Sequence, residues 1–394
     1  MELKGGAHLA YCTNIHPGET WPETFASLRT NTLGVRDRVD RNRRFAIGLR
    51  LSDKASRELL RGEALGAFRE WLAAENCYVF TINGFPYGQF HGGPVKEKVF
   101  TPDWITRERL LYTNRLFDIL AALLPDGLEG SVSTLPGSFK EFICNEQQID
   151  AIVENLWRCI DHISELSQRT GRVLHLGLEP EPFGLFENRT ETIAFFTRMA
   201  QRRPNDSRLR LHLGLNYDAC HFALQFEEAA ENLNAFREHD IQLSKIHLSS
   251  ALRFTPNASN LSKMNLFADD VYLHQVIARR NDGSLLRYSD LPVALAKNPP
   301  SVGSGVAGEP ADEWRVHFHV PLYASPMSGL DTTVDHSLAV LDWLAAHSGA
   351  CTHLEMETYT WAVLPPVLKS ANVIDQLVRE YEWILPQLAA RDLL

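Results

Sequence analysis

The feature that most constrains the fold of this chain is an alternation between short apolar runs and longer amphipathic segments. Nine runs have the length and composition of strands: Leu9–Ile15, Phe45–Leu51, Tyr78–Ile82, Ser131–Leu135, Leu174–Leu178, Leu209–Leu215, Leu243–Leu248, Val316–Val320 and His353–Met356. Segments with apolar residues at three- and four-residue spacing lie between most of them: Glu58–Ala74, Thr106–Leu124, Gln148–Gln168, Thr192–Ala200, Phe222–Phe236 and Ser337–Ala346. This repeated alternation predicts a parallel sheet covered by helices.

Two architectures fit such a sheet, an open doubly wound sheet and a closed (β/α)₈ barrel. Polar and charged residues follow strand after strand, and a barrel places its site at the carboxyl ends of its strands. The 394 residues exceed the roughly 250 that a barrel takes, so an insertion is needed. We therefore predict a single α/β domain over residues 1–394, a (β/α)₈ TIM barrel. Nine candidate strands compete for eight places, and Val316–Val320 is expected to be the extra one.

The expected insertion covers residues 253–313, before the last barrel strand. Asp282-Gly283 is a tight-turn signal between Val276–Arg280 and Ser284–Tyr288, which predicts a β-hairpin. A Pro/Gly-rich stretch follows from Asn298 to Pro310. Long irregular connections of this kind typically serve as lids or binding loops, or are disordered. A linker to a separate domain is the alternative.

Four strand-end residues, taken together, predict a metal site. Glu179 directly follows one apolar strand and Asp218 comes soon after the next. His247 lies within a third, and Glu357 follows the last. Buried carboxylates are costly unless they are paired or bind a metal. Carboxylates with one or two imidazoles suit Mn²⁺, Mg²⁺, Zn²⁺ or Co²⁺.

Each end of this set has a second candidate. Glu181 lies close to Glu179, and Glu355 shares a strand face with Glu357. We choose Glu179 because it directly follows its strand, and Glu357 because it lies nearer the carboxyl end. A hydrogen-bonded network of Glu, His and Asp without a metal is the alternative interpretation.

Five further residues are candidates for substrate binding, from several strand ends and one loop: His16, His91, Glu181, His221 and His319. His317 and His319 lie on one face of the Val316–Val320 run. His91 belongs to a loop of aromatic and small residues, a composition that fits a loop covering a substrate.

Charge and cysteine distribution exclude other classes of protein. The net charge of −10 argues against nucleic acid, because phosphate binding requires a basic surface. No apolar run approaches the roughly 20 residues of a membrane span. The six scattered cysteines form no Cys-x-x-Cys pair, which favours reduced thiols in the cytoplasm.

Four sequence blocks carry a resemblance to a known family: Tyr11–Trp21, Asn83–Gly88, Leu178–Pro182 and Glu357–Trp361. Together they resemble the EboE metabolite traffic family, within the xylose isomerase-like TIM barrel superfamily. The resemblance covers essentially the whole chain. It implies the superfamily fold and a place in a bacterial cluster for secondary-metabolite biosynthesis and export, among other enzymes. Metal ligands in the order Glu, Asp, His, Glu also resemble those of ketose epimerases, which lack the long insertion and the His-x-His run.

These expectations favour an enzyme, a metal-dependent isomerase or epimerase acting on a sugar or a cyclitol-like polyol. The divalent ion would be a Lewis acid toward two vicinal oxygens. Glu179 and Glu357 would be general base and acid, while His221 and His319 would orient hydroxyls. A metal-dependent hydrolase of phosphate esters, a barrel that only binds a metabolite, and a scaffold in a multienzyme assembly are the alternatives. A homo-oligomer is also compatible with the sequence.

Overall fold

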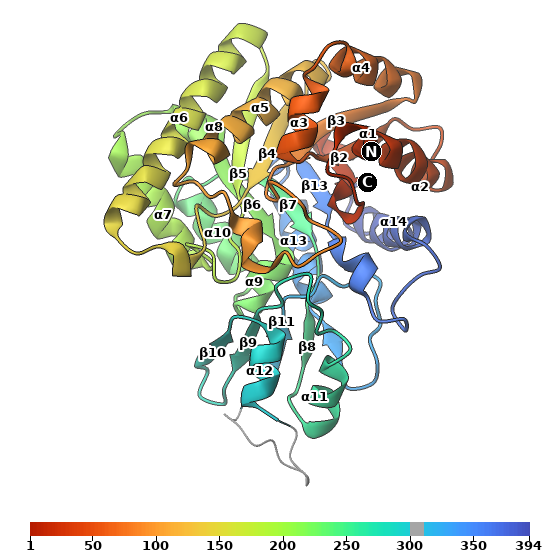
Figure 1. The fold of residues 1–394 in the computed structure, drawn as a ribbon, viewed down its shortest axis with the longest axis vertical. Helices are drawn as coiled ribbons and strands as arrows, with labels where there is room; N and C mark the ends of the chain where they lie inside the picture. Colours follow the sequence, from red (N-terminus) through yellow and green to blue (C-terminus); the bar gives the residue numbers. More distant parts are fainter. Residues whose placement is uncertain (300–310) are drawn as a thin grey trace.

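An eight-stranded parallel sheet forms the centre of the computed structural model, which describes residues 1–299 and 311–394 (Figure 1). Its strands are β1 (His8–Tyr11), β2 (Phe45–Arg50), β3 (Cys77–Asn83), β4 (Glu129–Thr134), β5 (Val173–Leu178), β6 (Leu213–Asp218), β7 (Leu243–Leu248) and β13 (His353–Met356). They are ordered β2-β3-β4-β5-β6-β7-β13-β1, and every pair is parallel. A parallel bridge between Cys12 and Gly48 joins the two edges. The predicted (β/α)₈ barrel is therefore confirmed.

Helices follow the strands and cover the outside of the barrel. They are α1 (Trp21–Ser27), α2 (Leu33–Val39), α3 (Asp53–Leu59), α4 (Ala64–Ala74), α5 (Arg107–Leu123), α6 (Glu146–Thr170), α7 (Arg189–Arg202), α8 (Arg208–His212), α9 (Ala219–Leu224), α10 (Ala229–Glu238), α13 (Val334–Ala346) and α14 (Val373–Ala389). Polar residues cap the long helices, as with Asn145 before α6 and Asn188 before α7. Shorter turns are 3-10 segments at Lys4–Gly6, Thr13–Ile15, Lys96–Phe100, Lys140–Phe142 and Tyr359–Val363, and a π segment at Leu28–Thr32.

The structure corrects some element boundaries. The run Leu209–Leu215 was expected to be a strand, but it starts in helix α8 and the strand begins only at Leu213. The expected helix Glu58–Ala74 is broken, because the chain turns at Gly62 with a φ of +55°. Of the run Val316–Val320, only Val316 lies in a strand, and that strand is outside the barrel sheet.

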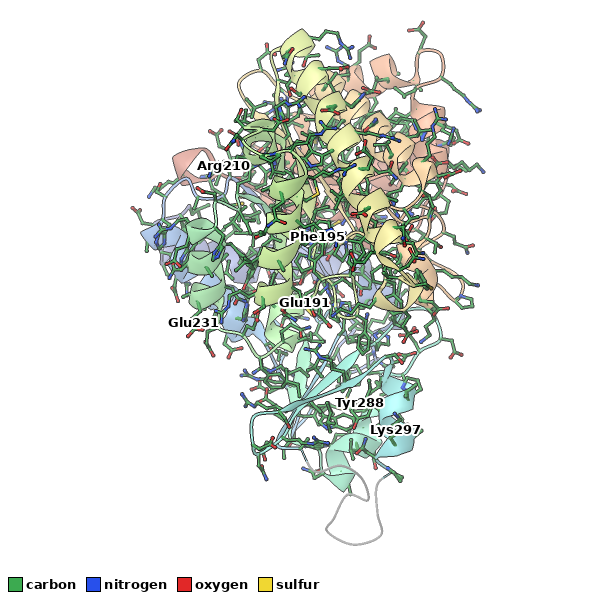
Figure 2. All side chains as sticks on the ribbon, turned by 90° about the vertical axis from the view of Figure 1, so that its left-hand side faces the viewer. Glu191, Phe195, Arg210, Glu231, Tyr288 and Lys297 are labelled. Carbon is green, nitrogen blue, oxygen red and sulfur yellow. The ribbon has the colours of Figure 1, made fainter. Side chains whose placement is uncertain are left out.

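The chain between β7 and α13 forms a second, antiparallel sheet at one end of the barrel (Figure 1). Its elements are β8 (Leu252–Phe254), α11 (Ala258–Met264), β9 (Val276–Arg279), β10 (Leu285–Tyr288), α12 (Leu291–Lys297), β11 (Glu313–Val316) and β12 (Asp331–Thr332), with the strand order β10-β9-β11-β8-β12. We call this segment the insertion. Figure 2 shows Tyr288 and Lys297 on it, apart from Glu191 and Phe195 on α7.

The insertion has its own apolar cluster, which includes Phe254, Leu261, Trp314 and Val316. β9 and β10 form a hairpin, with the turn at Asp282-Gly283 between them. Residues 300–310 of the Pro/Gly-rich stretch lie outside the described residues.

Polar contacts fix the insertion against the barrel loops. Arg287 donates to Glu187 over 2.9 Å, and the amide nitrogen of Gln275 donates to Pro182 O over 3.0 Å. On the other side, the backbone N–H of Val95, in the loop after β3, donates to Val271 O over 2.7 Å. The insertion is therefore hydrogen-bonded to the loops that follow β3 and β5.

The barrel interior is polar where the strands approach their carboxyl ends. Lys245 on β7 and Glu355 on β13 are fully buried and form an ion pair of 2.6 Å. Gly48 on β2 makes room for the pair, because a Cβ there would lie 1.8 Å from Glu355 Oε1. Glycine at this position thus permits a carboxylate inside the barrel.

Two further observations concern the chain as a whole. Within residues 1–299 and 311–394, none of the helices combines the length and apolar character needed to cross a membrane. All six cysteines are free thiols, and Cys144 alone among them is exposed.

A buried carboxyl on α14 ties three segments together near the barrel mouth. Glu380 accepts a hydrogen bond of 2.7 Å from Thr358 Oγ1, in the loop after β13. It accepts another, of 3.2 Å, from the backbone N–H of Leu322, between β11 and β12 of the insertion. Burial raises the pKa of Glu380 to about 7.

This pKa predicts how stability depends on pH. The folded protein holds a proton on Glu380 up to about pH 7, whereas the unfolded chain loses it near 4.5. Folding stability contributed by this group therefore falls as pH rises between these values. In Glu380→Gln the free energy of unfolding should lose this pH dependence. Between pH 4.5 and about 7 the parent protein should lose on the order of 3 kcal/mol more stability than the variant. Urea unfolding of both proteins from pH 5 to 8 measures it, and parallel stability curves would contradict the expectation.

Candidate metal centre

The four residues expected to bind a metal come together at the carboxyl edge of adjacent barrel strands. Glu179 follows β5, Asp218 ends β6, His247 lies in β7 and Glu357 follows β13. One ligand atom of each lies within 4.8 Å of the ligand atoms of the other three, and all four side chains are buried. The strand order thus converts scattered sequence positions into one cluster.

The three carboxylates converge on one nitrogen. Nδ1 of His247 lies 3.2 Å from Glu179 Oε1 and 3.2 Å from Glu357 Oε2. Oδ2 of Asp218 lies 3.4 Å from the same nitrogen. Three carboxylate oxygens and one imidazole nitrogen therefore face a common point.

Neighbouring donors hold the other oxygen of two of these carboxylates. Asn216 donates to Glu179 Oε2 over 2.8 Å. The hydroxyl of Ser249 and the backbone N–H of His221 donate to Asp218 Oδ1 over 2.7 and 3.0 Å. Oδ2 of Asp218 is buried and has no hydrogen-bond partner among the described residues.

The third carboxylate is fixed in the same way. The side-chain amides of Asn14 and Asn83 donate to Glu357 Oε1 over 2.8 and 3.2 Å. Its Oε2 is left to face His247. In each carboxylate, protein donors orient one oxygen, and the other faces Nδ1 of His247.

The imidazole of His247 is oriented from inside the barrel. Its Nε2 lies 2.9 Å from Glu355 Oε2, an oxygen that also accepts from Lys245. Burial opposes ionisation of Glu355, but Lys245 and His247 outweigh it and lower its pKa to about 2. A carboxylate that accepts from Nε2–H leaves Nδ1 as the coordinating nitrogen, the arrangement that metal-binding histidines typically have.

The electrostatics of the cluster favour a cation. Burial lowers the pKa of His247, but Glu357 and Glu179 outweigh it and hold the pKa well above its ordinary value. Burial likewise opposes ionisation of Asp218, but the nearby imidazoles of His221 and His319 hold its pKa well below the ordinary value. Positive charge is therefore strongly stabilised at this point, and the donor set fits a divalent ion.

A cavity opens beside Glu179 and Glu357, and aromatic rings form much of its wall. These rings come from the loops after β3 and β13 and from the insertion: Phe85, Phe90, Phe100, Tyr272 and Tyr359. Polar groups in the lining include Glu181, Gln275 and His317. Burial, together with the charges of Glu179 and Asp218, raises the pKa of Glu181 well above its ordinary value.

The predicted substrate residues divide into those near the cavity and those apart from it. Glu181 and His221 line it together with Glu179 and Glu357. His319 is fully buried, with Nδ1 2.9 Å from Glu357 O, and is not among the described residues of the lining.

The two remaining histidines make structural contacts. Nε2 of His16 lies 2.9 Å from Tyr11 OH, and His16 lines a separate small hollow with Arg50. Nε2 of His91 lies 2.6 Å from Asn14 O, and its Nδ1 lies 2.8 Å from Tyr272 OH. His91 therefore links a barrel loop to the insertion.

Several residues of the centre escaped sequence reasoning. The apolar run Leu209–Leu215 ends one residue before Asn216, so the pattern does not indicate that this amide lies within the strand. Lys245 offered a signal, since it shares a strand face with His247, and an inward lysine requires a carboxylate. Glu355, the alternative to Glu357 as a metal ligand, instead contacts Nε2 of His247, on the side of the ring away from the three carboxylates.

Comparison with models of protein families finds no match to this chain, and no curated protein matches it. Among solved structures, an L-ribulose 3-epimerase has a TM-score of 0.51 at 11% sequence identity, covering 99% of this chain and 96% of that protein. A probable 3-DHS dehydratase, AsbF, from Bacillus anthracis has a TM-score of 0.49 at 11% identity, covering 96% and 98%. The IOLI protein, solved with a zinc atom, has 0.49 at 12%, covering 97% and 98%. At these identities the likeness shows the fold alone, that of a (β/α)₈ barrel.

The hydrogen bond from Ser249 predicts a measurable effect on metal affinity. Ser249→Ala should weaken Mn²⁺ or Co²⁺ binding about 10–100-fold, because it frees the oxygen of Asp218 that the hydroxyl holds. Ser244→Ala removes a comparable buried hydroxyl on β7, the strand that ends just before Ser249, and this hydroxyl pairs with His175 over 2.6 Å. Titration of the demetallated proteins should therefore separate the two variants. Equal affinities in both would contradict a metal at Asp218.

Proposed function

We propose that this protein is a metal-dependent isomerase or epimerase acting on a sugar or cyclitol-like polyol. The observation that carries the proposal is the pair Glu179 and Glu357. Both line the cavity, and each has one oxygen fixed by amide donors and one left free. Two such carboxylates beside one cavity suit removal of a proton from carbon and its return.

Each group of the site has a role in this proposal. A divalent cation held by Glu179, Asp218, His247 and Glu357 would act as a Lewis acid toward substrate oxygens. Glu179 and Glu357 exchange the proton with the substrate carbon. Glu181 and His221, which line the cavity, contact and orient the hydroxyls of the substrate.

The cavity wall supports a polyol substrate. Aromatic faces pack against the C–H side of a sugar ring, while a few convergent polar groups fix its orientation. Tyr272 and Tyr359 supply such faces near Glu181 and Gln275. An L-ribulose 3-epimerase shares the fold, which is compatible with this class of substrate.

The EboE-like blocks extend the proposal to a biological setting. We infer a cytoplasmic role in a bacterial cluster for biosynthesis and export of a secondary metabolite, alongside other enzymes of that cluster. The motif residues Asn14, Asn83 and Glu357 meet in the centre, which supports a common purpose for the blocks that contain them.

A second candidate is hydrolysis of a phosphate ester. The histidines beside Asp218 favour it. Asp218 belongs both to the group with Glu179, His247 and Glu357 and to a group with His221 and His319, and a carboxylate in this position can bind two metals. Two-metal sites typically catalyse in-line displacement at phosphorus.

One assay separates these reactions. Protein loaded with Mn²⁺ or Co²⁺ is incubated in D₂O with ketoses, inositols and sugar phosphates. Isomerisation or epimerisation exchanges a carbon-bound proton with solvent deuterium, which NMR detects, whereas hydrolysis releases inorganic phosphate. Phosphate release without exchange would reject the isomerase proposal.

The role of Glu179 is tested in the same assay. Glu179→Gln should keep the fold and lose turnover by about 10²–10⁴-fold, because an amide cannot take the proton. The control is Glu191→Gln, which changes the partly exposed partner of Lys140. Its turnover should stay close to that of the parent protein. Retained turnover in Glu179→Gln would refute the assignment.

A further inference from the structure

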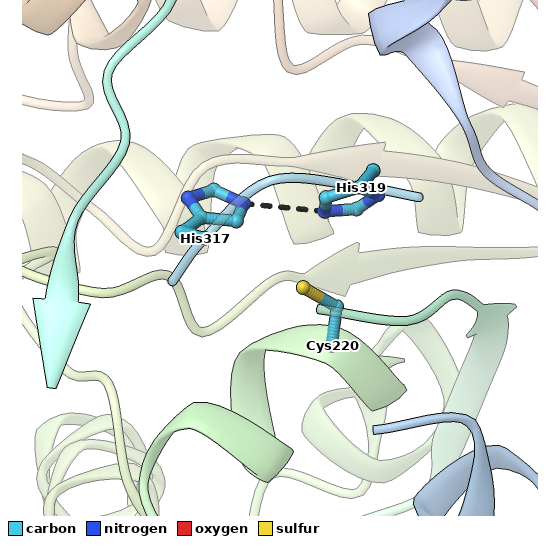
Figure 3. A group of neighbouring side chains, drawn as sticks. All are labelled: Cys220, His317 and His319. Atoms are coloured by element: carbon cyan, nitrogen blue, oxygen red, sulfur yellow. Dashed lines mark hydrogen bonds between the residues drawn. The ribbon is translucent and has the colours of Figure 1, made fainter. Parts of the chain in front are cut away.

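Three histidines gather beside the metal centre, and two of them come from the insertion. His221 lies on α9, three residues after Asp218. His317 and His319 lie on the segment that leaves β11 and returns toward the barrel. Figure 3 shows these two imidazoles side by side, with Cys220 of α9 directed toward them.

For two of these imidazoles, a neighbouring backbone carbonyl determines which ring nitrogen carries the hydrogen. Nδ1 of His221 lies 2.8 Å from Pro180 O, and Nδ1 of His319 lies 2.9 Å from Glu357 O. A backbone carbonyl can only accept, so each Nδ1 carries the hydrogen. In the neutral ring, Nε2 then presents a lone pair.

The third imidazole is fixed through Gln275. Nδ1 of His317 lies 2.6 Å from Gln275 Oε1. The amide nitrogen of Gln275 donates to Pro182 O over 3.0 Å, which fixes the amide so that its oxygen faces the ring. The hydrogen of His317 is therefore on Nδ1 as well.

The Nε2 atoms converge. His317 Nε2 lies 3.1 Å from His221 Nε2 and 3.2 Å from His319 Nε2. Lone pairs at these distances repel each other unless a positive charge lies among them. Two nitrogens bound at about 2.0–2.1 Å to one tetrahedral ion lie roughly 3.4 Å apart, close to both spacings.

Asp218 connects this group to the first cluster. Its Oδ1 lies 3.9 Å from His221 Nε2, and its Oδ2 faces His247. Asp218, His221 and His319 each offer a ligand atom within 4.8 Å of the others. Glu181 Oε2, 3.2 Å from His221 Nε2, is a further oxygen donor within reach.

We propose that His221, His317 and His319 bind a second cation, with Asp218 as the carboxylate shared between the two sites. Imidazole donors, with the thiol of Cys220 nearby, select Zn²⁺ or a similar transition metal over Mg²⁺ or Ca²⁺. With Nδ1 of His221 on Pro180 O and Nε2 on this cation, the cation takes over the contact to the substrate hydroxyl that was assigned to His221. The number of bound metals itself does not depend on which reaction the protein catalyses.

Metal stoichiometry tests it directly. Demetallated full-length protein is titrated with Zn²⁺, and bound metal is measured after gel filtration. The parent protein should bind two equivalents and the double variant His317→Gln/His319→Gln one. His212→Gln, which changes a buried histidine bonded to Leu174 O before β6, should still bind two. One equivalent in the parent protein, or two in the double variant, would overturn the proposal.

Variant folding is checked by circular dichroism. If the double variant is unfolded, the single variant His317→Gln replaces it, with the same expected loss of one equivalent. The parent stoichiometry needs no variant at all. Activity does not enter the readout, so failure of the isomerase proposal and failure of the second site are distinguishable.

Discussion

The contact between His247 and Glu355, deep in the barrel, is the interaction on which the centre depends. Lys245 keeps Glu355 ionised, and Glu355 in turn orients the imidazole so that Nδ1 faces three carboxylates. Gly48 leaves the space that this buried pair needs. Removing one partner of such a pair would leave a buried charge uncompensated, which typically costs 3–5 kcal/mol. The charge and orientation of the candidate metal centre therefore depend on the buried ion pair of the barrel core.

The insertion changes what a barrel mouth of this kind can do. It adds Tyr272 and Gln275 to the cavity wall and returns two histidines to the carboxyl edge of the strands. Its own apolar cluster packs its sheet, and Gln275 and His317 directly adjoin the strands β9 and β11 of that sheet. A rigid support positions a site more closely than a flexible loop would.

Much of the fold and part of the site could be predicted from the sequence. Strands such as Leu243–Leu248 were found with correct limits because buried parallel strands are continuous apolar runs. The four converging residues followed from the rule that strand ends share one edge. Other features depend on long-range packing: no local pattern tells that His91 contacts Asn14. Local patterns also do not show that His317 contacts His221. The fold of the antiparallel sheet, most of which lies between these two residues in the sequence, brings them together.

The central claim is that a divalent cation occupies the point shared by Glu179, Asp218, His247 and Glu357. A crystal soaked in Mn²⁺ and measured for anomalous scattering tests it most directly. The account predicts a strong anomalous peak bonded to His247 Nδ1 and to one oxygen of each carboxylate, at roughly 2.0–2.3 Å. A map with no peak there, and with the carboxylates still hydrogen-bonded to His247, would contradict it.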